Sequence, residues 1–298
     1  MSDVQTQPLL GGEHYSEPEP TSSGIGRTTS RWMVPLEAVS AALTLGIIGL
    51  LLAAVLSRYV FASAIVWIDE VVSISFIWLT MIGAALAMHR NEHLRLSLVV
   101  DKLPARWQPF VHAFALTVVA AFLLGLLPSA VEYAQEEWFI KSPALDLPNT
   151  YRVASIPFGL GLMLLILMGY AWRTVPVKAL VSAVLLVGAT AALCHVLAPS
   201  LPALGSWNMV IFLVGVVAVC LMAGVPIAFC FGLGALSYLA FTTQVPLLIV
   251  VGRMDEGMSS LILVSVPIFV LLGCVLDATG MGKAIVDFLA SLIGHVKR

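Results

Sequence analysis

The chain has 298 residues, of which 60% are hydrophobic and only 11% are charged, and its formal net charge is -2. Soluble domains carry about 25% charged residues, so this composition excludes an ordinary soluble globular protein. The near-neutral charge also excludes the basic surface of a nucleic-acid-binding protein. Repeated apolar runs of about 20 residues predict an all-α polytopic membrane protein.

The first 32 residues are polar and rich in Pro, Ser, Thr and Gly. Such a composition cannot bury enough apolar surface to fold, so residues 1–32 are predicted to be a disordered tail. The first apolar run begins near Met33 and lasts longer than the apolar core of a cleavable signal. It is therefore expected to stay in the membrane as a span.

About eight membrane spans are expected in chain order, at residues 34–56, 68–88, 109–131, 154–172, 178–198, 207–223, 226–243 and 259–276. An amphipathic segment follows at 281–296. This order divides the chain into the tail, a four-helix membrane unit at 33–176, a connector helix and loop at 177–206, and a region of Pro- and Gly-broken helices at 207–298.

The distribution of Lys and Arg predicts a cytoplasmic N-terminus, because cytoplasmic loops carry the excess of positive charge. With that orientation, 11 basic residues lie inside: Arg27, Arg31, Arg90, Arg95, Lys102, Arg106, Arg173, Lys178, Lys283, Lys297 and Arg298. Only 4 lie outside: Arg58, Lys141, Arg152 and Arg253.

Two adjacent carboxylates, Asp69 and Glu70, stand at the start of the second span. Carboxylates at a helix N-terminus gain from the helix dipole, so they could simply mark a helix start. Charges so close to hydrocarbon also favour a partner, which indicates a contact with a neighbouring helix or subunit. Arg58 lies on the same predicted side and is the nearest candidate partner.

The other end of the second span carries His89, Arg90 and His93. This cluster is interpreted as an inner interfacial anchor, and His93 is kept as a candidate contact between helices or subunits. On the outer side, residues 132–152 are expected to form an acidic loop with Trp138. That loop could dock a soluble extracytoplasmic partner, or it could be a solvated loop with an interfacial tryptophan.

Two proline positions predict helix breaks in the last third of the chain. Gly224 and Pro226 flank Val225, and Pro267 interrupts the eighth predicted span. Proline removes a helical hydrogen bond and restricts the residue before it. Broken helices bind ions and substrates in transporters, but a tight turn between two short spans explains the same residues.

Motifs of soluble enzymes are absent: the sequence has no G-x-S-x-G, no Walker motif, no H-E-x-x-H and no paired carboxylates inside a span. No catalytic residue, metal site or cofactor is predicted. Without an ATP-binding motif, any transport would be driven by an ion gradient or by another chain.

The residues above resemble a known family of membrane transporters. The first set resembles the small DctQ-type subunit of TRAP transporters: Arg58-Tyr59-Val60-Phe61, Trp67-Ile68-Asp69-Glu70, Phe76-Ile77-Trp78-Leu79, Gly83-Ala84-Ala85 and His93. Asp69 departs mildly from that pattern, which more often has a second Glu, whereas Glu70 matches it. The second set resembles the start of the large DctM-type subunit: Gly224-Val225-Pro226-Ile227-Ala228-Phe229, Val266-Pro267-Ile268-Phe269 with Val270-Leu271-Leu272-Gly273, and Ile293-Gly294-His295.

The resemblance implies a fused small subunit and a partial large subunit in a bacterial inner membrane. In this family a periplasmic solute-binding protein delivers an organic acid, for which C4-dicarboxylates are the typical class, and the large subunit moves it, usually with sodium. The partners implied are the bilayer, the remainder of the large subunit and the binding protein. The re-entrant hairpins and sodium loops of the large subunit are not expected within these residues, so no ion or substrate ligand is assigned.

The leading prediction is therefore a scaffold component of a TRAP permease that does not transport alone. The alternative is a membrane-embedded anchoring protein that recruits a periplasmic partner. The sequence leaves open the substrate, the coupling ion and the number of spans after residue 206.

Overall fold

The computed structural model describes residues 33–63, 65–90, 104, 107–199 and 205–293. These residues are almost entirely helical and contain no β-strand, which confirms the predicted all-α class. The predicted tail at 1–32 and His93 lie outside the described residues.

Five helices are long and apolar enough to cross a membrane. They are α1 (Val34–Tyr59), α2 (Val66–His89), α3 (Gln108–Glu136, continued by a 3₁₀ turn η2 at Glu137–Phe139), α4 with α5 (Thr150–Val153 and Ser155–Thr174), and α6 (Val177–Leu197). They correspond to the first five predicted spans. The third runs further than predicted, because helix continues through Glu132 and Glu136.

The last third of the described chain consists of shorter helices. A stretch of α7 (Trp207–Met209), π-helical η4 (Val210–Val216) and α8 (Val217–Met222) is followed by α9 (Ile227–Thr242). Then come α10 (Leu248–Met258), α11 (Leu261–Val264), α12 (Val266–Ala278) and α13 (Met281–Ile293). Helix α10 and the helix that begins at Ile262 are bent by 50° and together could form a sixth span. The predicted count of about eight is reached when the two shorter apolar helices, 207–222 and 227–242, are included.

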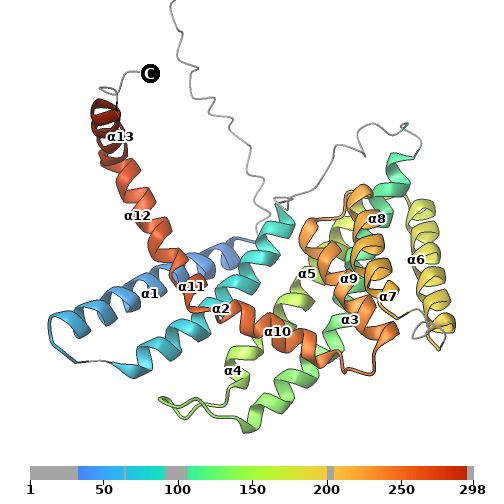
Figure 1. Ribbon diagram of the computed structural model, residues 1–298, viewed down its shortest axis with the longest axis horizontal. Helices are drawn as coiled ribbons and strands as arrows, with labels where there is room; N and C mark the ends of the chain where they lie inside the picture. Colours follow the sequence, from blue (N-terminus) through green and yellow to red (C-terminus); the bar gives the residue numbers. More distant parts are fainter. Residues whose placement is uncertain (1–32, 64, 91–103, 105–106, 200–204, 294–298) are drawn as a thin grey trace, which may run out of the picture.

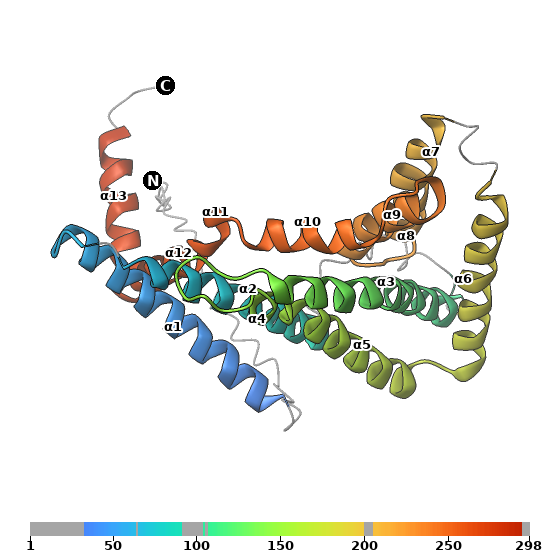
Figure 2. The same cartoon turned by 90° about the horizontal axis from the view of Figure 1, so that it is seen from below.

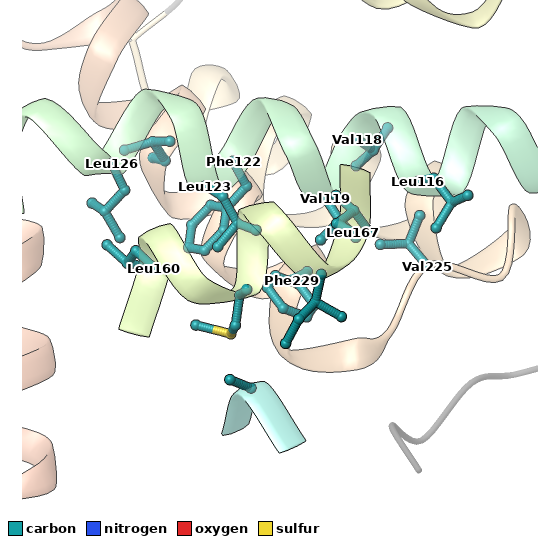
Figure 3. Packing of buried hydrophobic residues seen from close by; sticks show 14 of the residues in the cluster. Leu116, Val118, Val119, Phe122, Leu123, Leu126, Leu160, Leu167, Val225 and Phe229 are labelled. Atoms are coloured by element: carbon teal, nitrogen blue, oxygen red, sulfur yellow. The ribbon is translucent and has the colours of Figure 1, made fainter. Parts of the chain in front are cut away.

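Helix α3 is the central element of the core. Leu126 lies near Leu160 of α5 and Val119 lies near Leu167 of the same helix, while Val225 and Phe229 of the later region pack against α3 (Figure 3). The rings of Phe122 and Phe229 meet edge to face with centroids 5.8 Å apart. The four-helix unit and the later helices therefore share one hydrophobic core.

Helix α9 can approach α3 closely because Gly232 has no side chain. A Cβ atom at Gly232 would lie 2.8 Å from the Phe122 ring, inside van der Waals contact. Gly159 has the same role between α5 and α2, where a Cβ atom would lie 2.7 Å from Cβ of Met81. These small residues permit close helix packing in a membrane, where apolar faces alone give little association.

The C-terminal helices extend away from this core. α10 lies along α2 and α3, and α12 and α13 project beyond the bundle, as Figures 1 and 2 show. A second, small cluster of Ile47, Ile68, Val72 and Val264 packs α11 against α1 and α2.

Candidate functional site: a polar joint

One buried ion pair joins the four-helix unit to the later helices. Arg152 of α4 donates from Nη2 to Oδ2 of Asp255 in α10 at 2.7 Å. The side chain of Asp255 is only 5% exposed and that of Arg152 is 22% exposed. Since these residues are 103 positions apart, the pair links distant parts of the chain.

Two more side chains complete this site, which we call the polar joint (Tyr133, Arg152, Asp255 and Ser259). The Tyr133 hydroxyl donates to Oδ2 of Asp255 at 3.3 Å, and Nη1 of Arg152 donates to the Ser259 hydroxyl at 2.9 Å. The Ser259 hydroxyl in turn donates to the backbone carbonyl of Asp255 at 2.7 Å. Buried charges require this degree of hydrogen bonding to offset their loss of hydration.

The local sequence explains why Asp255 faces inward. Val251 lies four residues before Asp255, on the same face of α10, and is completely buried. Gly252 lies beside α3, where a Cβ atom would make an ordinary contact with the Tyr133 ring at 3.8 Å. The charged residues Arg253 and Glu256 point the other way and form an exposed pair at 2.7 Å.

Arg152 is held in place from its own side. Its Nε donates to Oδ1 of Asn149 at 3.0 Å, and the Asn149 amide donates to the carboxylate of Glu137. The Thr150 hydroxyl fixes the start of α4 by donating to the Ala134 carbonyl at 2.8 Å. All three nitrogens of the Arg152 guanidinium therefore donate to protein groups.

Glu70 contacts a loop. Its carboxylate accepts the backbone N–H of Ala144 at 2.6 Å and that of Leu145 at 2.9 Å. These amides lie at the tip of residues 140–149, which we call the loop hairpin. Backbone bonds from Ser142 to Leu147 (2.8 Å) and from Asn149 to Ile140 (2.8 Å) close the loop hairpin.

The structure does not bring the other predicted contact residues together. Arg58 and Asp69 are exposed, and no ion pair between Arg58 and either carboxylate is found within the described ranges. Glu70 binds backbone amides and not Arg58, because the tip of the loop hairpin folds over the start of α2. Arg90, at the other end of α2, pairs with Glu37 of α1 at 2.8 Å.

The predicted helix breaks lie at junctions between consecutive helices. Gly224 has φ +75°, a conformation that side-chain-bearing residues rarely adopt, and Pro226 directly precedes α9. Pro267 lies in the first turn of α12, where its missing N–H costs nothing. Among the described residues, neither position lies beside a group of acidic or other metal-binding side chains.

A cavity of about 270 Å³ lies beneath the loop hairpin, bounded by Glu70, Lys141, Asn149 and Arg152 among others. Its charged groups already have protein partners: Lys141 pairs with Asp146 at 2.9 Å, and Glu70 and Arg152 are bonded as described. Within the described part of the chain, no three His, Cys, Asp or Glu residues could hold a metal ion. Each charged side chain described around this cavity therefore has a partner within the protein.

Sequence reasoning missed Asp255 and α10, and it placed Tyr133 in an acidic loop. That expectation of a loop was wrong for residues 132–139, which are helical and turn directly into the loop hairpin. The only signal was that Asp255 lies four residues after Val251, on the same face of a helix. That Arg152 is the partner of Asp255 could not be read from the sequence.

Two family models match this chain. The model "Tripartite ATP-independent periplasmic transporters, DctQ component" matches residues 47–177, and the DctM component of the same transporters matches residues 214–298. The polar joint connects these two matched regions, with Tyr133 and Arg152 in the first and Asp255 and Ser259 in the second.

This chain is similar to two fused curated relatives and to a separate large permease protein. The isethionate TRAP transporter permease protein DctMQ of Oleidesulfovibrio alaskensis is 27% identical over 78% of this chain and 36% of its own length. The sialic acid TRAP transporter permease protein SiaT of Haemophilus influenzae is 22% identical over 87% of this chain and 44% of its own length. The C4-dicarboxylate TRAP transporter large permease protein DctM of Rhodobacter capsulatus is 30% identical over 27% of this chain and 18% of its own length. The chain thus spans less than half the length of the fused relatives it matches.

Proposed function

Because this chain belongs to the TRAP transporter permeases, with a DctQ-type region fused to part of a DctM-type region, we propose that it supplies the fixed scaffold of an uptake system for organic anions. TRAP permeases are transporters and not enzymes, and this chain is a multi-pass inner-membrane protein of that kind. The alternative of an independent anchoring protein is not favoured, because both regions match components of one transporter.

The polar joint is the observation that supports the scaffold role. A scaffold must keep its helices in one arrangement while a partner moves against it. The buried Arg152–Asp255 pair and the shared core around Phe122 and Phe229 give the two regions that rigidity. Buried ion pairs with well-satisfied hydrogen bonds specify one geometry even where they add little net stability.

The substrate class, the coupling ion and the partners are part of the proposal. The relatives are named for isethionate, sialic acid and C4-dicarboxylates, which are all organic acids. We propose a substrate of that class, C4-dicarboxylate-like, sodium coupling, a periplasmic solute-binding protein and further DctM-type sequence as partners. The cytoplasmic placement of the N-terminus belongs to this proposal too.

The test is reconstitution into liposomes with an inward sodium gradient and a substrate-loaded binding protein. The 298-residue chain alone is expected to give no uptake. The same chain, co-purified with a fragment that supplies the remaining DctM-type sequence, is expected to take up the organic anion. Sodium-dependent uptake by the chain alone contradicts the scaffold role. Failure to associate with any DctM-type fragment contradicts the proposed partnership.

A further inference from the structure

The carboxylate of Glu70 stands at one end of a continuous series of contacts that leads to the polar joint. It accepts two backbone N–H groups at the tip of the loop hairpin, at 2.6 and 2.9 Å. Hydrogen bonds between a carboxylate and backbone amides are charge-assisted and are stronger than neutral ones. A single side chain of α2 therefore fixes the tip of the loop hairpin relative to the bundle.

Backbone hydrogen bonds within the loop hairpin hold its tip in a fixed position relative to its closing residues. Two backbone bonds cross it, Ser142 to Leu147 and Asn149 to Ile140, and Asp146 adopts a left-handed conformation with φ +53° at the turn. Its closing residue, Asn149, accepts the Nε donor of Arg152 at 3.0 Å. The tip of the loop hairpin and the guanidinium of Arg152 are thus connected through the hydrogen-bonded backbone of the loop hairpin and the side chain of Asn149.

Arg152 has little freedom to reach Asp255 from another position. Helix α4 is only 4 residues long and begins directly after the loop hairpin. Glu137 also holds Asn149, and the Thr150–Ala134 bond holds α4, so a shift of the loop hairpin acts on Arg152 through the bond from its Nε to Asn149. The Arg152–Asp255 pair is the only short ion pair described between the two matched regions.

We propose that Glu70 is a positioning residue for the polar joint: through the loop hairpin it sets Arg152 against Asp255 and so couples the DctQ-type region to the DctM-type region. This role deepens the proposed scaffold function and rests on it. Glu70 touches neither Arg152 nor Asp255 in any described contact, so its effect must pass through the hairpin.

Limited trypsin digestion of the purified chain in nanodiscs tests this directly, because trypsin cuts after Lys141 in the loop hairpin and after Arg152 in α4. When opening is fast relative to cleavage, each rate follows the population of the locally opened form. Fragments from the two sites are distinguished by mass spectrometry. Asp255→Asn, which weakens the ion pair directly, should raise cleavage after Arg152 and shows that this site reports on the joint.

Glu70→Ala is expected to raise cleavage after both Lys141 and Arg152 by about tenfold, since two charge-assisted hydrogen bonds are lost. Glu70→Gln should give a smaller rise at both sites, because its amide keeps one acceptor oxygen and presents a donor to the second N–H. Asp69→Asn is the matched control, since Asp69 is adjacent and exposed, and should change neither rate by more than about twofold.

Faster cleavage after Lys141 alone would overturn the proposal, because it would show a loop anchor that does not reach the joint. Unchanged cleavage at both sites would overturn it as well. If Glu70→Ala does not fold, the thermal shift caused by Glu70→Gln is compared in wild-type and Asp255→Asn backgrounds. Equal shifts refute the coupling, and a shift at least halved in the Asp255→Asn background supports it. None of these readouts uses transport, so they are independent of the uptake assay.

Discussion

Helices α3 and α12 are both strongly apolar, yet their surroundings differ completely. Ten residues of α3 are buried, and it packs against α5, α6, α9 and α10. In α12 only Pro267 is buried, and Phe269 is 65% exposed. The difference teaches that hydropathy marks a helix for the membrane but does not decide how much of that helix packs on protein.

The largest effect is expected from breaking the polar joint. Arg152→Ala would leave Asp255 buried without its counter-charge, and such a loss costs about 3–5 kcal/mol. Denaturant or thermal unfolding in mild detergent should show it. The matched control is Lys141→Ala, which removes an exposed pair with Asp146 and should cost under about 1 kcal/mol. If the two variants lose similar free energies of unfolding, the polar joint stabilises the protein no more than an exposed ion pair does.

The contrast between α3 and α12 can be tested with phenylalanine. Phe122→Ala removes a ring that is only 7% exposed and packs on Phe229, so we expect a loss of about 2 kcal/mol from the cavity. This value lies below the range for soluble proteins because detergent also solvates the unfolded apolar surface. Phe269→Ala, on the exposed helix, should leave the unfolding midpoint unchanged. A larger effect at Phe269 would contradict the described packing of α12.

A smaller effect is expected from two glycines of α5. Gly159→Ala would place Cβ 2.7 Å from Cβ of Met81, and we expect about 1–2 kcal/mol of destabilisation as α2 and α5 move apart. At Gly161, two residues further on, an added methyl group would have no atom within 4 Å, so Gly161→Ala should be neutral or slightly stabilising. Scanning calorimetry or thermal unfolding by fluorescence distinguishes the two variants.

The smallest effect is expected at the other end of the bundle. Glu37→Gln removes the Arg90 pair, whose side chains are 42% and 29% exposed, so the loss should be under about 1 kcal/mol. Raising the salt concentration should remove most of that difference, because exposed ion pairs are screened. The cost of Arg152→Ala should persist in high salt. Equal salt sensitivity would indicate that the polar joint is solvated.

The sequence by itself determined the class and the main order of elements. Its charge content and apolar runs predicted a polytopic helical protein, and the first five spans coincide with the five long helices. Gly224 and Pro226 predicted a break that the structure contains as a turn. The length of an apolar run and the geometry of proline depend only on neighbouring residues, so both can be read from the sequence.

Tertiary structure decided which polar groups meet. The sequence predicted a helix or subunit contact for Glu70, and in the structure its partners are the backbone amides of Ala144 and Leu145, which carry no mark in the sequence. A Cβ atom at Gly83 of α2 would meet nothing within 4 Å, and the tight contact between α2 and α5 lies at Gly159. The pairing of Arg152 with Asp255 depends on α10 returning to α3, and such a long-range contact has no local signal.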